Sequence, residues 1–116
     1  MRNKSIAFAF LALTASAMLA AAHAFLDHSD PRVGNTVKSS PSAVTLWFTQ
    51  KLEPAFSSAQ VTNASGAVVS TGASVSGTVM RVSVRSLPPG TYRVHWKVLS
   101  VDTHTTEGNF TFRVGQ

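Results

Sequence analysis

Asp102 and His104 are the pair of side chains in this sequence whose spacing is most suited to binding a metal ion. They are separated by one residue and follow a segment of alternating apolar residues that ends near position 99. In an extended backbone, residues two apart project to the same side, so both side chains can reach one ion. Taken alone, Asp-Thr-His is better explained by an Asx-type turn beside an exposed histidine. The pair therefore predicts a metal site only together with ligands from elsewhere in the chain.

His23 supplies such ligands if it becomes the first residue of the mature chain. The free α-amine and the Nδ1 atom of an N-terminal histidine can bind one metal together in a chelate ring. An α-amine has an ordinary pKa of about 7.7 to 8.0, so a strongly Lewis-acidic ion can displace its proton at neutral pH. Together with Asp102 and His104, this residue would complete a set of three nitrogens and one carboxylate oxygen.

This ligand set favours Cu(II). Planar or tetragonal sites of nitrogen and oxygen suit Cu(II), and copper also stands highest in the affinity order of the divalent ions. Zinc prefers a tetrahedral arrangement, and Ca²⁺ or Mg²⁺ would need more oxygens. The chain has no cysteine, which excludes a thiolate site and a disulfide framework. We therefore expect one Cu(II) per chain, bound by His23, Asp102 and His104.

The N-terminal segment is typical of a secretory signal peptide. Residues 1–22 have a basic start, an apolar stretch from Ile6 and an alanine-rich end. We therefore expect a signal peptide over 1–22, one domain over 23–116, and export to the periplasm. No later segment approaches the roughly 20 apolar residues that a membrane span needs, so no membrane insertion is expected.

The cleavage rule allows two positions for the mature N-terminus. Small residues are required at the third and first positions before the cut. Ala20 and Ala22 meet this requirement for a cut before His23, and Ala22 and Ala24 meet it for a cut after Ala24. The proposed ligand set requires the first of these two positions.

Hydrophobic periodicity predicts an all-β fold. Apolar residues alternate with polar ones in several segments, without a convincing helical stretch, and turn signals separate these segments. We expect a single immunoglobulin-like Greek-key β-sandwich or barrel, with residues 72–77 forming a loop of small residues. Tyr92 follows a Pro-Pro-Gly turn and is either a tyrosine corner or simply the first core aromatic of its strand. The expected core faces are Val44, Leu46 and Phe48; Met80, Val82 and Val84; Tyr92, Val94, Trp96 and Val98; and Phe110, Phe112 and Val114.

Charge and the other histidines suggest few further functions. Eight of the ten Lys and Arg residues lie after position 22 but are scattered along the chain, so no nucleic-acid partner is expected. His95 is expected to face solvent. His28 is either an exposed polar residue, the favoured interpretation, or an outer-shell group of the metal site. We expect a monomer.

Two segments resemble the CopC family of bacterial periplasmic copper-resistance proteins. The run from Leu87 to His104 (Leu-Pro-Pro-Gly-Thr-Tyr-Arg-Val-His-Trp-Lys-Val-Leu-Ser-Val-Asp-Thr-His), with Gly108–Val114 after it, is similar to the family's C-terminal signature. The start, His23-Ala-Phe-Leu followed by Ser-Asp-Pro31, resembles the mature N-terminus of that family. This resemblance covers essentially all of 23–116. It implies a Greek-key sandwich or barrel in which His23, Asp102 and His104 bind Cu(II).

The chain departs from the family pattern at two places. Some family members bind Cu(I) through a methionine-rich loop of soft thioether ligands. Met80 is the only methionine after the expected leader, so we expect neither a Cu(I) site nor exchange between two copper sites. Gln50 stands where related proteins often have an acidic residue, so no carboxylate contact to the metal ligands is expected from that position.

The resemblance implies a non-catalytic copper binder that serves copper homeostasis and resistance. It would buffer periplasmic Cu(II) or deliver it to an inner-membrane copper transporter of the CopD type. Two alternatives remain open. Lytic polysaccharide monooxygenases also hold copper with an N-terminal histidine brace, although Asp102 would block the position that oxygen needs. The other is a metal-free immunoglobulin-like binding module, with Trp47 and Trp96 as its candidate contact residues.

Overall fold

The described part of the chain is folded almost entirely into β-strands. The computed structural model describes residues 25–115, so the expected leader and His23 lie outside the described residues. Within that range no helix is long and apolar enough to cross a membrane. The elements are β1 (Leu26–Asp30), β2 (Thr36–Val37), β3 (Ala43–Phe48), the 3-10 turn η1 (Pro54–Phe56), β4 (Ser58–Thr62), β5 (Ser70–Ser76), β6 (Val79–Val84), β7 (Gly90–Leu99) and β8 (Thr105–Val114).

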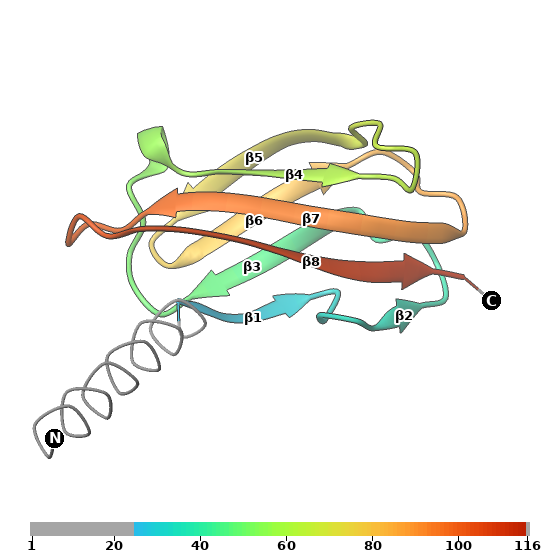
Figure 1. Ribbon diagram of the computed structural model, residues 1–116, viewed down its shortest axis with the longest axis horizontal. Helices are drawn as coiled ribbons and strands as arrows, with labels where there is room; N and C mark the ends of the chain where they lie inside the picture. The colour runs from blue at the N-terminus through green and yellow to red at the C-terminus, as the bar shows by residue number, and fades with distance from the viewer. Residues whose placement is uncertain (1–24, 116) are drawn as a thin grey trace, which may run out of the picture.

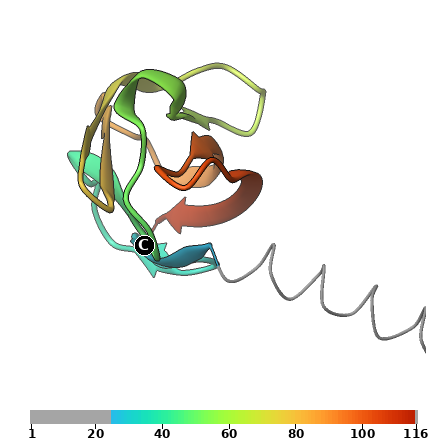
Figure 2. The same cartoon turned by 90° about the vertical axis from the view of Figure 1, so that its left-hand side faces the viewer.

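The strands form two four-stranded sheets that pack face to face. One sheet has the order β1-β3-β6-β5 and the other has the order β2-β8-β7-β4 (Figure 1). Neighbouring strands are antiparallel except for the short β2–β8 pair, which is parallel. Figure 2 shows the two layers enclosing the interior, viewed toward the end of the molecule at which β1 begins. The predicted all-β, immunoglobulin-like sandwich is confirmed.

The core consists of the inward faces that the two-residue period predicts, except that Val84 is only partly buried at its edge. Along β3 and β7 every second residue is buried, because successive side chains of a strand point to opposite faces. Burying each such large apolar side chain contributes about 1.5–3 kcal/mol. The buried core residues on β3, β6, β7 and β8 are Val44, Leu46, Phe48, Met80, Val82, Tyr92, Val94, Trp96, Val98, Phe110, Phe112 and Val114.

Tyr92 satisfies both interpretations that the sequence allowed. Its ring is buried and stacks on Phe112 with the ring centroids 5.7 Å apart. Its hydroxyl donates a hydrogen bond to the carbonyl of Pro88, four residues upstream. The residue is therefore a core aromatic and a tyrosine corner, and it ties the turn before β7 to the strand.

The prediction of a loop over 72–77 was wrong, because most of this segment belongs to β5. Small residues have weak strand propensity, but here tertiary pairing overrides it. Ala73 pairs with Val82, and Val75 pairs with Met80 on the neighbouring strand β6. Val75 also packs against the core. Only Gly77, with φ of 62°, adopts the left-handed conformation that the tight β5–β6 turn uses.

Candidate metal centre

Two chain segments meet at the end of the sandwich where β1 begins (Figure 1). One follows β3 and the other is the turn between β7 and β8. Leu52 forms an isolated antiparallel bridge with Ser100. The backbone N–H of Val101 donates to the carbonyl of Lys51 at 2.9 Å. These contacts hold the residues after β3 against the turn that carries Asp102 and His104.

The structure brings Asp102 and His104 together. Nδ1 of His104 lies 3.2 Å from Oδ1 of Asp102, and the two side chains are 76% and 44% exposed. The two side chains are therefore close enough together to contribute to one site. Solvent therefore has access to both side chains.

The backbone of this pair is not extended, contrary to the expectation from the two-residue spacing. Thr103 has φ of 74°, a left-handed conformation that is unusual for a β-branched residue. It lies in a tight turn in which its N–H donates to the carbonyl of Ser100 at 2.9 Å. The side chains of Asp102 and His104 therefore converge because of the turn. Backbone strain of this kind is concentrated at functional sites in many proteins.

Ser100 is the polar residue around which the turn is built. It is 1% exposed. Its hydroxyl donates to Oδ1 of Asp102 and accepts the backbone N–H of His104 at 3.2 Å. The hydroxyl hydrogen bond is the main reason why the pKa of Asp102 lies below its ordinary value; the neighbouring His104 lowers this pKa further, and partial desolvation opposes the shift.

We predict that Ser100→Ala raises the pKa of Asp102 toward its ordinary value of 3.8. Because the folded-state pKa is lowered in the parent protein, Asp102 contributes stability above the unfolded pKa, and this contribution is lost as the pH falls through the folded value. In the variant, the ionised Asp102 carboxyl contributes less stability. The free energy of unfolding of the variant should therefore depend less on pH below about pH 4. Carbon-13 NMR of the carboxyl group measures the pKa directly. Ser74→Ala, on the exposed face of β5, is the control and should leave the pKa unchanged.

Gln50 also contacts Asp102, which the sequence did not predict. With its amide nitrogen toward the carboxylate, Gln50 donates to Oδ2 at 2.6 Å and to Oδ1 at 3.0 Å. The two residues are far apart in the chain, and only the packing of the segment after β3 against the β7–β8 turn brings them together. Gln50 therefore contributes a neutral hydrogen-bond donor to Asp102.

Phe25 fixes the start of the described chain at this same end. It is 7% exposed and packs edge-to-face on Phe48 with the ring centroids 5.6 Å apart. Its carbonyl accepts the backbone N–H of Thr49 at 2.9 Å and the hydroxyl of the same residue at 3.3 Å. Thr49 directly precedes Gln50, so a short path of contacts leads from Phe25 to Asp102.

The remaining histidines lie elsewhere. His28 is exposed as favoured, but its ring stacks on Trp47 with the centroids 4.4 Å apart, and its Nδ1 is 2.6 Å from Asp27 Oδ2. His95 lies on the outer face of the second sheet, where Glu107 Oε2 is 3.0 Å from its Nε2. Within 25–115, no three His, Asp or Glu side chains gather closely enough to hold a metal ion.

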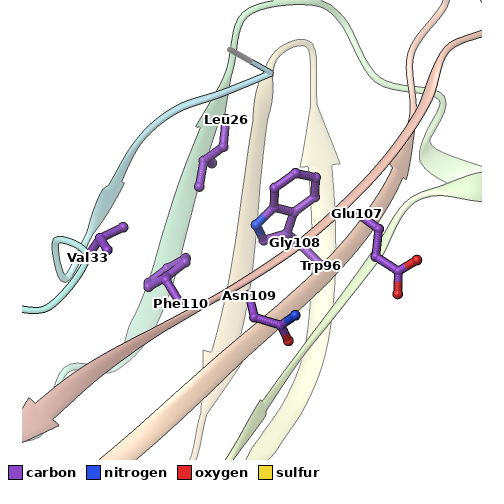
Figure 3. Close-up of a pocket in the computed structure, with 7 residues that line it drawn as sticks. All are labelled: Leu26, Val33, Trp96, Glu107, Gly108, Asn109 and Phe110. Carbon is purple, nitrogen blue, oxygen red and sulfur yellow. The ribbon is translucent and has the colours of Figure 1, made fainter. Parts of the chain in front are cut away.

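A separate cavity of about 470 Å³ opens between β1 and β8 (Figure 3). The Trp96 indole lies beside Gly108 and is directed toward Leu26, whereas the side chains of Glu107 and Asn109 point away from that ring. The lining includes one carboxylate and no histidine, and most of its exposed surface is apolar. This cavity therefore lacks the donors that a copper ion requires.

Comparisons with known proteins identify the family of this chain. Residues 26–115 match the family model of the CopC domain. The chain is 35% identical to Protein YobA of Escherichia coli K12, over 96% of this chain and 95% of that protein. It is 34% identical to Copper resistance protein C of Xanthomonas campestris pv. juglandis, over 96% of each.

A solved structure shares the fold. The crystal structure of CopC from Methylosinus trichosporium OB3b superposes with a TM-score of 0.75 and 33% identity, covering 78% of this chain and 92% of that one. The family consists of copper-binding resistance proteins and not of enzymes. With the sandwich, the family model and these relatives in agreement, the chain belongs to the CopC family of copper resistance proteins.

Proposed function

We propose that this protein binds one Cu(II) ion in the periplasm through an N-terminal histidine brace at His23, completed by Asp102 and His104. The observation that carries the proposal is the 3.2 Å contact between His104 Nδ1 and Asp102 Oδ1, at the end of the sandwich where the mature chain would begin. Removal of residues 1–22 by signal peptidase would create the brace.

The anchoring of Phe25 supports a ligand role for His23. Two extended residues span at most about 7 Å. The carbonyl of Phe25 is bound to Thr49, and the next residue, Gln50, is bound to Asp102. From that anchor, His23 would have only a short distance to span to the carboxylate. A cut after Ala24 would leave no histidine in that position.

The exposure of the two ligands supports a role in handing copper on. An enclosed site would retain its ion, whereas the side chain of His104 is largely exposed and open to exchange with another protein. We therefore propose that the protein buffers periplasmic Cu(II) and delivers it to an inner-membrane copper transporter of the CopD type, in the service of copper resistance.

A copper titration tests the site. Protein verified by mass to begin at His23 should bind one equivalent of Cu(II), with a tetragonal three-nitrogen, one-oxygen electron paramagnetic resonance (EPR) spectrum. Loss of an outer-shell partner of a metal ligand lowers the affinity by about 10- to 100-fold. His104→Ala removes a proposed ligand itself, so it should lower the Cu(II) affinity by more than that. His95→Ala is the matched control, because this half-exposed histidine lies on the outer face of the second sheet, and it should bind as the parent does.

Two outcomes would contradict the proposal. Equal affinity in the His104→Ala variant and the parent protein would exclude His104 as a ligand. Steady hydrogen peroxide formation from ascorbate and oxygen by the copper-loaded protein, with oxidation of chitin or cellulose, would instead support a monooxygenase.

A further inference from the structure

We infer that Gln50 is a positioning residue for the copper ligand Asp102, and that it leaves Oδ2 as the carboxylate oxygen available to the ion. The inference rests on the proposed copper site.

The orientation of the amide follows from its surroundings. One terminal atom of Gln50 lies 2.6 Å from Oδ2 and 3.0 Å from Oδ1 of Asp102. If that atom were the amide oxygen, it would face two further acceptors with no proton between them. The nitrogen must therefore face Asp102, and its N–H groups donate charge-assisted hydrogen bonds to the carboxylate.

Counting the donors around Asp102 separates its two oxygens. Oδ1 accepts the hydroxyl of Ser100 and also faces the Gln50 nitrogen at 3.0 Å and His104 Nδ1 at 3.2 Å. Among the described residues, the structure shows only the Gln50 nitrogen donating to Oδ2. An ionised carboxylate has about four lone-pair positions, two on each oxygen. Oδ2 therefore keeps an open position when Gln50 is in place, whereas Oδ1 is crowded.

Gln50 also links the two parts of the proposed site. The residue before it, Thr49, binds the carbonyl of Phe25 through both its N–H and its hydroxyl. Thr49 and Gln50, which follow β3, thus contact Phe25 at the start of the described chain and the Asp102 carboxylate, respectively. A glutamate in the same place would bring two carboxylates within 2.6 Å and repel Asp102 when both are ionised. The uncharged amide orients Asp102 without that repulsion.

Gln50→Met tests this role, because it keeps the length of the side chain and removes the N–H donors. Cu(II) affinity, measured by competition with a chelator, should fall by about 10- to 100-fold. The EPR g and hyperfine values should shift, since the equatorial oxygen is less constrained. In the metal-free protein at pH 7, the carbon-13 shift of the Asp102 carboxyl should also change. Gln60→Met, at an exposed position on β4, is the matched control and should change none of these.

The outcomes separate this inference from the proposed function. If the parent protein binds Cu(II) with the expected spectrum and Gln50→Met binds with the same affinity and spectrum, the role of Gln50 is wrong and the copper site stands. An unchanged Asp102 carboxyl shift in metal-free Gln50→Met would exclude the contact itself. If the parent protein binds no Cu(II), both proposals fail.

Discussion

A chain that begins at Phe25 is expected to lose Cu(II) affinity by at least about 1,000-fold relative to the chain that begins at His23. Losing one outer-shell partner of a metal ligand already costs about 10- to 100-fold. The shortened chain loses the His23 imidazole and moves the free amine by two residues, so half of the proposed donors are removed. What remains is the exposed Asp102–His104 pair, which within the described residues has no third ligand.

Both chains can be produced without a leader, and intact mass identifies the first residue of each. The fold should survive the truncation, because Phe25 itself remains and its carbonyl still binds Thr49. Ala24→Gly in the chain that begins at His23 is the control and should bind Cu(II) normally, since it leaves all four donors in place. If the chain that begins at Phe25 retained the parental Cu(II) affinity, this result would contradict the histidine brace. The mass of the naturally exported protein should correspond to a start at His23.

Gly108→Ala is expected to destabilise the fold by about 1–3 kcal/mol, the usual cost of overpacking a core. A Cβ atom at position 108 would lie 2.5 Å from Cζ2 and 2.8 Å from Cε2 of the Trp96 ring, much closer than atoms in contact allow. The ring cannot move aside easily, because it is 4% exposed and packs edge-to-face on Phe48 at 5.3 Å between ring centroids. Gly108 is therefore required by the indole that covers it, as Figure 3 shows.

Denaturant unfolding of the metal-free protein measures this loss. Each kcal/mol corresponds to a fall in Tm of roughly 4–8 °C in a domain of this size. Gly72→Ala is the matched control, because a Cβ atom at that position meets nothing within 4 Å and φ is not positive there. The double variant Gly108→Ala, Trp96→Phe should lose less stability than the sum of the two single variants, because the smaller ring makes room for the methyl group. Additive losses would show that the clash is not the cause.

The sequence predicted the sandwich well, because burial on one face of a strand imposes a two-residue period that tertiary context rarely disturbs. Val44, Leu46 and Phe48 are all buried as that period requires. Residues 72–77 were predicted as a loop because small residues carry almost no hydrophobic period. Pairing with β6 makes most of that segment a strand, and no local pattern records such pairing.

The proposed metal site was likewise only partly predictable from the sequence. The chain alone determined which residues have suitable donors, since Asp102 and His104 are close in sequence and ligand chemistry depends on residue type. Only the tertiary structure decided that Ser100 and Gln50 hold the Asp102 carboxylate and that Phe25 anchors the chain start beside them. Gln50 and Asp102 meet because two loops pack at one end of the sandwich. Contacts between residues so distant along the chain arise from the packing of whole sheets, which no short stretch of sequence encodes.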